Sequence, residues 1–191
     1  QEQLNKEEAK QYRLPRMRLE KTVYIEETDT YLIPGGEYTA TVTGYDWEYV
    51  NLKGGHAEGG TLTLLWHERA GLVICGGMSQ YTMREANNMQ LPRFGRHKCV
   101  TPRLECTALD GKTVYSSLYD GRCEMIFSET GAGTVITVKG RLTDINHHIL
   151  EDGGAYDAEY SFEAGGVRVR INVNQNARFI LPLVSESTEK A

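Results

Sequence analysis

The sequence predicts an all-β protein: a two-sheet antiparallel β-sandwich with about a dozen strands. Short stretches rich in Val, Ile, Thr and Tyr alternate apolar and polar residues, as strands with one buried face do. Turn pairs such as Asp110-Gly111 and Asp120-Gly121 recur along the second half of the chain. The 191 residues suffice for one such domain. No long internal repeat indicates a propeller or solenoid.

The first half of the chain is expected to hold an arm and five strands. Residues 1–18 are predicted to form a short N-terminal helical arm or connector, because residues 1–12 are rich in helix formers and poor in apolar anchors. Pro34-Gly35-Gly36 is a strong turn signal after the second strand. Alternation and β-branched or aromatic content predict strands over 19–25, 31–33, 38–45, 61–66 and 71–75.

The second half reads as consecutive antiparallel strands, and residues 19–191 are expected to form a single β-sandwich domain. In VRVRINV, Val167, Val169 and Ile171 are predicted to face the core while Arg168 and Arg170 face out. Strands are expected over 99–109, 113–119, 122–127, 133–139, 156–163, 167–173 and 179–184.

Composition excludes some classes of partner. The formal net charge is −5 and no basic run occurs, which argues against nucleic acid, since phosphate binding needs clustered Lys and Arg. No apolar run approaches the roughly 20 residues that a membrane-spanning helix needs. No signal peptide is visible, so the chain is expected to be a mature product or a piece of a longer protein.

The four cysteines are not spaced as CxxC, so they give no zinc-ribbon or redox signal. They are expected to be free and buried in strands. A bridge from Cys99 to Cys106 or to Cys123 remains open if neighbouring strands align them.

The richest candidate site is the stretch from Gly54 to Gln90. His56 and Glu58 lie two apart between glycine pairs, so in extended backbone their side chains share a face and can meet one ligand or metal. A flexible exposed loop would give the same pattern. Trp47, with Tyr45 and Tyr49, can form a stacking platform for a sugar ring or contribute to the core.

A polar cluster follows within the same stretch. Glu85 and Asn88 offer donors and acceptors that suit sugar hydroxyls, although a loop that bonds its own backbone would look the same. Arg84 lies beside them and suits a uronate carboxylate. His97 can bring a second imidazole to His56. His147-His148 are expected to be surface residues, because adjacent side chains on a strand point to opposite faces.

Residues 54–100 resemble the C-terminal β-sandwich of heparinase II/III-like polysaccharide lyases. The resemblance rests on His56-Ala57-Glu58-Gly59-Gly60 entering a strand, then Cys75-Gly76-Gly77, Tyr81 and His97. It implies a helical toroid domain upstream, β-elimination of uronic-acid polysaccharides, and catalytic groups contributed mainly by the toroid. It also implies a zinc site at His56, Cys75 and His97. Glu58, Cys75 and Lys98 depart from the Asp, Asp and Asn of the family pattern.

The predicted function is therefore a non-catalytic β-sandwich domain of a larger polysaccharide-degrading protein. The domain would support a groove for an acidic polysaccharide or other glycan, with no cofactor beyond that zinc. The alternatives are a stand-alone carbohydrate-binding module and a structural or interaction domain without a ligand. The resemblance implies a periplasmic or secreted bacterial location.

Overall fold

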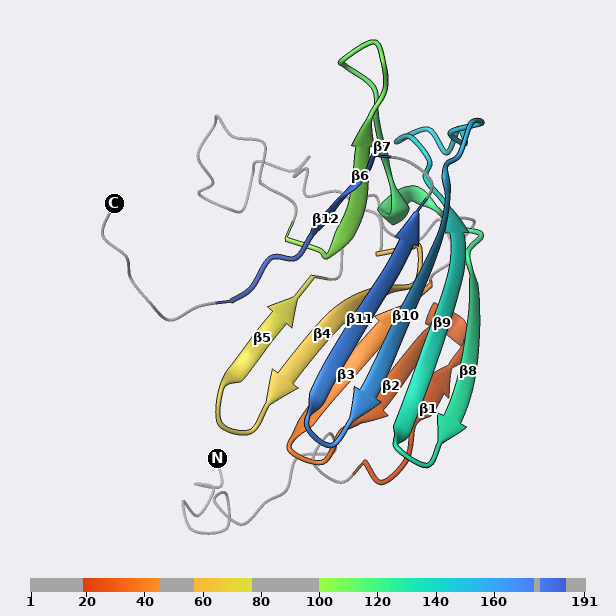
Figure 1. Cartoon of the computed structure of the whole chain (residues 1–191). Helices are drawn as coiled ribbons and strands as arrows, with labels where there is room; N and C mark the ends of the chain where they lie inside the picture. The colour runs from red at the N-terminus through yellow and green to blue at the C-terminus, as the bar shows by residue number, and fades with distance from the viewer. Residues whose placement is uncertain (1–18, 45–56, 77–99, 174–175, 185–191) are drawn as a thin grey trace, which may run out of the picture.

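The structure is a computed structural model, and it describes residues 19–44, 57–76, 100–173 and 176–184. These residues form twelve strands in three antiparallel sheets, with two single turns of 3-10 helix, Glu26–Thr28 and Ser117–Tyr119 (Figure 1). The all-β prediction is confirmed. The predicted helical arm over residues 1–18 lies outside the described residues.

A five-stranded sheet is formed by the first strands in chain order, β1-β2-β3-β4-β5. Each strand pairs with the next in an antiparallel hairpin or over a longer connection. His67 closes the β4–β5 turn, because its Nδ1 accepts the Arg69 backbone N–H at 3.1 Å. The strands are β1 (Val23–Ile25), β2 (Thr30–Pro34), β3 (Tyr38–Thr43), β4 (Thr61–His67) and β5 (Gly71–Cys75).

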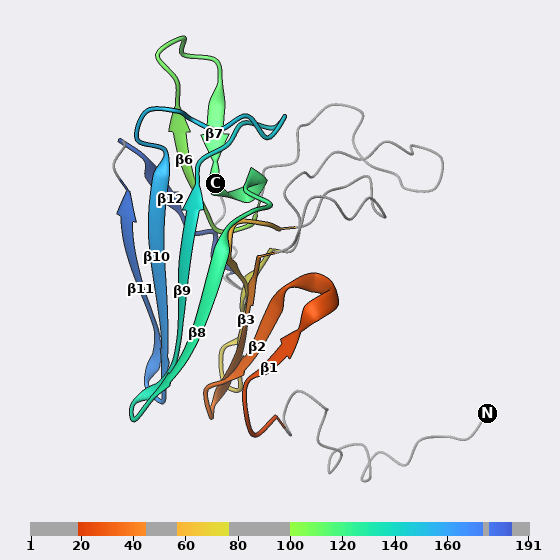
Figure 2. The same ribbon diagram turned by 90° about the vertical axis from the view of Figure 1, so that its right-hand side faces the viewer.

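A four-stranded meander forms the second layer, in the order β11-β10-β9-β8. Its strands are β8 (Glu124–Thr130), β9 (Gly133–Arg141), β10 (Ala155–Glu163) and β11 (Gly166–Val173). Along β11 the arginines are exposed while the valines and Ile171 are partly buried, as the alternation predicted. Figure 2 shows the two sheets side-on as separate layers, which is the predicted sandwich.

A third, smaller sheet adds to the two layers of the sandwich. It holds β12 (Arg178–Ile180), β6 (Arg103–Thr107) and β7 (Val114–Ser116), in the order β12-β6-β7. Thr143 links it to the segment after β9 through an isolated bridge to Ser116. Local alternation marks each of these strands, but it carries no information on which distant strand each will pair with.

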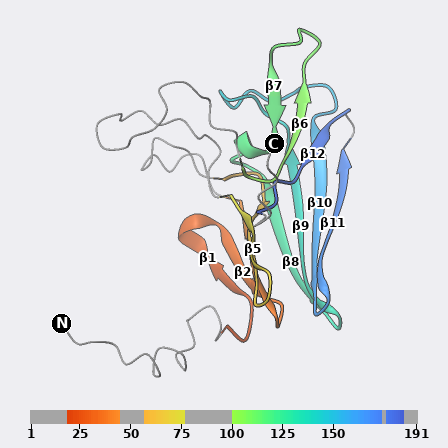
Figure 3. The same cartoon turned by 90° about the vertical axis from the view of Figure 1, so that its left-hand side faces the viewer.

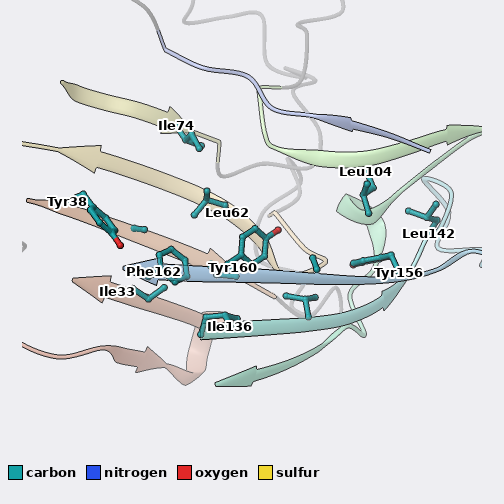
Figure 4. Close-up of a cluster of buried hydrophobic side chains, with 14 of the residues drawn as sticks. Ile33, Tyr38, Leu62, Ile74, Leu104, Ile136, Leu142, Tyr156, Tyr160 and Phe162 are labelled. Carbon is teal, nitrogen blue, oxygen red and sulfur yellow. The ribbon is translucent and has the colours of Figure 1, made fainter. Parts of the chain in front are cut away.

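The core lies between the two larger sheets and extends under the third (Figure 4). Ile33 and Val42 from the first sheet and Ile136 and Val138 from the second are fully buried. Tyr38 spans the layers, since its hydroxyl donates to the Glu163 carbonyl at 2.8 Å. None of the described helices is long and apolar enough to cross a membrane.

The described cysteines are free, as expected, but not all are buried. Cys106 is buried and Cys123 half-buried, whereas Cys75 is exposed at the end of β5. Cys99 lies outside the described residues, so neither proposed bridge is tested.

Candidate functional site

A cleft of about 600 Å³ opens at the end of the four-stranded sheet where β8 begins and β9 ends. Figure 1 shows this end at the top of the sheet, beside β7. Its volume falls within the roughly 300–1,000 Å³ that small-ligand sites occupy. The lining residues come from three segments: Tyr119, Asp120, Gly121, Arg122 and Glu124; Lys139, Gly140 and Arg141; and Thr143, Asn146, His147 and Ile149.

Asp120 is the buried residue that joins the segments lining the cleft. Its buried carboxylate accepts the Arg141 backbone N–H at 2.6 Å and the Arg122 backbone N–H at 3.2 Å. The Tyr156 hydroxyl lies 3.4 Å from the same carboxylate and donates to the Gly59 carbonyl at 2.9 Å. The start of β8 and the end of β9 are thus fixed to one buried acid.

Gly140 makes this arrangement sterically possible. A Cβ at Gly140 would overlap the Asp120 carboxylate and the Tyr156 ring. With glycine there, the Asp120 side chain can reach the backbone of the strand end. The cleft floor therefore depends on a residue that contributes no side chain to it.

Burial raises the pKa of the Asp120 carboxyl, while hydrogen bonds from the Arg141 and Arg122 backbones oppose the rise. The folded protein therefore keeps this proton to higher pH than the unfolded chain, whose ordinary value is 3.8. Asp120's contribution to the free energy of unfolding is full below that value and is lost as pH rises through the folded pKa.

We expect Asp120→Asn to destabilise the domain by about 1–3 kcal/mol at acidic pH, because the amide replaces one carboxyl oxygen with an NH2 group that would face the backbone N–H of Arg141 or of Arg122. The loss should be larger near pH 4 than near pH 7, because the wild-type advantage declines as Asp120 ionises. Urea unfolding of both proteins at the two pH values measures this difference. A loss that grows toward neutral pH would contradict the direction given for the pKa.

The mouth of the cleft is predominantly cationic. Arg122, Lys139 and Arg141 are exposed, whereas of the two carboxylates lining the cleft, Asp120 is buried and only Glu124 is exposed. Lys139 and Arg141 lie two apart on β9, so both point to the outer face of the sheet. Anionic groups are the ligands that such a mouth attracts.

His147 is held in an uncommon backbone conformation at the cleft wall. Its φ is 64°, in the left-handed region that few non-glycine residues adopt. Asp144 shapes the loop, since its carboxylate accepts the Asn146 and His148 backbone N–H groups at 2.8 and 2.9 Å. The Nδ1 of His147 lies 2.8 Å from the Tyr119 carbonyl. A carbonyl can only accept, so Nδ1 carries the proton.

Thr143 adds a buried hydroxyl to the lining. Its side chain is 4% exposed, and its Oγ1 has no hydrogen-bond partner in the described part of the chain. A buried hydroxyl without a partner costs free energy that a bound polar ligand can recover.

Two of the residues predicted from sequence fall within the described structure. Glu58 is buried, and the next residue, Gly59, donates its N–H to the Asp120 carbonyl at 3.1 Å. Cys75 is exposed on the five-stranded sheet. The other predicted residues, His56, Trp47, Arg84, Glu85, Asn88 and His97, lie outside the described residues. The binding and metal roles given to all of these residues stay predictions.

Glu58 belongs to the acidic surroundings of the Cys123 thiol. Burial raises the pKa of Cys123, and the nearby charges of Asp120, Asp29 and Glu58 add to the rise.

Among the described residues, no cluster of three His, Cys, Asp or Glu side chains could hold a metal ion.

Sequence reasoning missed most of the cleft residues. His147 was expected at the surface, yet it is half-buried and lines the cleft, while His148 is exposed as expected. One sequence signal could have indicated the site: Lys139-Gly140-Arg141, in which two cations flank a glycine. This segment ends β9 and lies close to the Asp120-Gly121 turn that precedes the paired strand β8.

Comparison with known proteins gives the family. The ulvan lyase C-terminal domain family matches residues 23–191. The chain belongs to the ulvan lyase C-terminal domain family. A broad-specificity ulvan lyase from Formosa agariphila is 27% identical in an alignment of 186 residues that covers 93% of this chain and 28% of the relative. The chain thus spans less than a third of that curated relative's length. No solved structure gives a significant match.

Membership in the ulvan lyase C-terminal domain family refines the resemblance drawn from sequence. The coarser expectation, a C-terminal domain of polysaccharide lyases, is confirmed. The family that matches is the ulvan lyase one. The narrower likeness to heparinase II/III-like lyases, which the His56 motif indicated, stays a prediction.

Proposed function

We propose that this chain is a non-catalytic β-sandwich domain of a larger polysaccharide lyase, and that its cleft binds an acidic polysaccharide. The observation that carries the proposal is the trio of exposed cations, Arg122, Lys139 and Arg141, around one cleft. Ulvan, the polysaccharide named for the relative, is the first ligand to test.

The cleft offers two kinds of contact to such a ligand. Arginine and lysine side chains donate charge-assisted hydrogen bonds to carboxylate or other oxyanion groups. Thr143 and Asn146 provide a hydroxyl and an amide, which can pair with sugar hydroxyls. Family membership supports a place for this domain in a longer lyase. The matched family is the C-terminal domain of ulvan lyases, and the chain covers only 28% of the relative's length.

The proposal extends to the layout of the whole protein. A catalytic domain, of the helical toroid type implied by the heparinase II/III resemblance, would precede the sandwich and supply the acid and base of β-elimination. The sandwich would hold the charged chain against it. A periplasmic or secreted location is part of the same proposal, since a polysaccharide substrate is found outside the cell.

Affinity electrophoresis of the isolated chain tests the binding claim. We expect gels containing ulvan to retard the protein, gels containing a neutral glucan to leave it unretarded, and added salt to weaken retardation because the contacts are ionic. Size-exclusion chromatography of ulvan incubated with the chain should show no shortening. Equal retardation by the neutral glucan would contradict the cationic-cleft account.

A further inference from the structure

Two of the described residues that line the cleft are buried, and only one of them has its polar group paired. These residues are Asp120 and Thr143. The Asp120 carboxylate accepts hydrogen bonds from the Arg141 and Arg122 backbones. The Thr143 hydroxyl has no hydrogen-bond partner in the described part of the chain. Buried side-chain oxygens are nearly always paired, so an unpaired one in a cleft wall points to a partner that binds there.

The backbone of Thr143 is fixed between two neighbouring segments. Its N–H donates to the Ser116 carbonyl at 3.2 Å, and its carbonyl accepts the Ser116 N–H at 2.8 Å. A second bridge pairs Thr143 with Ile149. Figure 3 shows the segment between β9 and β10 passing beside β7, where the bridge to Ser116 forms. The position of Thr143 is therefore set by the fold, whichever way its side chain turns.

The Thr143 side chain can turn toward a ligand without disturbing this framework. Rotation about χ1 moves a threonine hydroxyl from one staggered position to another. Because the Thr143 hydroxyl makes no hydrogen bond within the described residues, this rotation breaks none. A ligand in the cleft can therefore gain a hydrogen bond from a hydroxyl that both donates and accepts.

Thr143 continues the row of cations that ends β9. Lys139, Arg141 and Thr143 are alternate residues, and all three line the cleft. Leu142, between the last two, is fully buried in the core. Ile149, the bridge partner of Thr143, also lines the cleft and is 46% exposed. The same part of the wall thus offers two charges, a neutral hydroxyl and an apolar side chain.

These groups together match a sugar that carries an anionic substituent. A simple anion would engage only the cations, and the hydroxyl and the exposed isoleucine would stay unused. A sugar ring presents hydroxyl groups next to a face of C–H bonds, so it can engage the hydroxyl and the isoleucine at once. A few placed polar groups beside apolar side chains are typical of sites that fix the orientation of a small ligand.

We propose that Thr143 is the specificity-determining residue of the cleft: its hydroxyl pairs with a ring hydroxyl of an anionic sugar unit, and Ile149 contacts the C–H face of that ring. This inference rests on the proposed function, in which the cleft binds an acidic polysaccharide. The cations attract any polyanion, whereas Thr143 and Ile149 select polyanions built from sugars. A site that pairs with a ligand hydroxyl discriminates against ligands that lack one.

Thr143→Val tests the hydroxyl, because valine keeps the shape of threonine. Affinity for ulvan oligosaccharides should fall about fivefold to tenfold, as expected for the loss of one neutral hydrogen bond. The fold-change should be the same at two salt concentrations, because the lost contact is uncharged. Thr143→Ser keeps the hydroxyl and should bind within about twofold of wild type. Isothermal titration calorimetry measures these affinities.

Polyacrylate, an anionic chain without hydroxyl groups, is the control ligand. Wild type and Thr143→Val should bind it within about twofold of each other, because the cations are unchanged.

The stability of ligand-free Thr143→Val gives a second readout. Removing a buried, unpaired hydroxyl removes its desolvation penalty, so the urea midpoint of unfolding should rise. Thr61→Val is the matched control, since Thr61 is 3% exposed and its hydroxyl donates to the Pro102 carbonyl at 2.5 Å. Its midpoint should fall, because a hydrogen bond is lost.

Ile149→Ser tests the apolar contact. Affinity for ulvan oligosaccharides should fall roughly threefold, because less apolar surface is buried on binding. Ile145→Ser is its matched control, since Ile145 is 51% exposed in the same segment but does not line the cleft. Ile145→Ser should leave the affinity unchanged.

Four results would overturn the inference and leave the proposed function standing. They are equal ulvan binding by wild type and Thr143→Val, an equal loss of polyacrylate binding in that variant, a lowered unfolding midpoint for it, and equal effects of the two isoleucine variants. The lowered midpoint would mean that the hydroxyl is already paired in the ligand-free protein. Failure of the wild-type chain to bind ulvan oligosaccharides would overturn the proposed function itself, and the inference with it.

Discussion

Gly59→Ala is expected to lower the free energy of unfolding by about 2–5 kcal/mol. Gly59 has a φ of 70°, where a Cβ is strained, and that Cβ would overlap the Ser117 carbonyl oxygen. Its N–H and carbonyl also bond Asp120 and Tyr156, so a shift of this turn disturbs the cleft floor. Urea unfolding monitored by circular dichroism measures the loss.

Gly36→Ala separates the two contributions. Gly36 also has a left-handed φ, 79°, but a Cβ there would meet nothing within 4 Å. Gly36→Ala should therefore lower the free energy of unfolding only by the backbone strain, about 1–2 kcal/mol. Gly165→Ala, with neither strain nor a neighbour, should change little. If Gly59→Ala and Gly36→Ala cost the same, the close packing of Gly59 against Ser117 is not a stability determinant.

The double variant Lys139→Gln, Arg141→Gln is expected to weaken binding of ulvan by roughly tenfold or more. Each side chain donates charge-assisted hydrogen bonds to an anionic group, and two such exposed contacts contribute about 1–2 kcal/mol together. The salt dependence of the dissociation constant should become shallower, because fewer ionic contacts remain. Isothermal titration calorimetry at two salt concentrations gives both quantities.

Arg168→Gln, Arg170→Gln is the matched control for that experiment. These arginines also lie two apart on the outer face of the same sheet, and their loss changes the net charge by the same amount. They are on β11, away from the cleft-lining segments. Binding should stay within about twofold of wild type, because only the general charge has changed. An equal loss in both variants would assign binding to net charge and not to the cleft.

The strands were predictable from sequence because their signal is local. VRVRINV shows its buried and exposed faces in seven consecutive letters, and Asp110-Gly111 marks a turn by itself. Tyr38–Thr43 and Thr61–His67 match their predicted strands to within a residue or two. The third sheet was not predictable, since β6 pairs with β12, more than seventy residues later, through backbone bonds that any sequence can make.

The cleft was not predictable because its parts are distant in sequence. Asp120 acts through a strand end 21 residues away, at Arg141, and through Tyr156 on a third segment. His147 read as a surface residue because its left-handed backbone, which turns it toward Tyr119, has no marker in the letters around it. Gly59 and Gly60 pack tightly against Ser117 and Val138, contacts between segments distant in sequence that no local pattern marks.

Titrating the isolated, isotope-labelled chain with ulvan oligosaccharides and following backbone amide chemical shifts tests the central claim most directly. The account predicts shifts concentrated in two regions, residues 119–124 and 139–149, which hold the cleft lining. The shifts should be absent in the Lys139→Gln, Arg141→Gln variant at the same ligand concentration. Shifts centred on Tyr45, Trp47 and Tyr49 with the cleft unchanged would contradict it and place the glycan on the aromatic stretch instead.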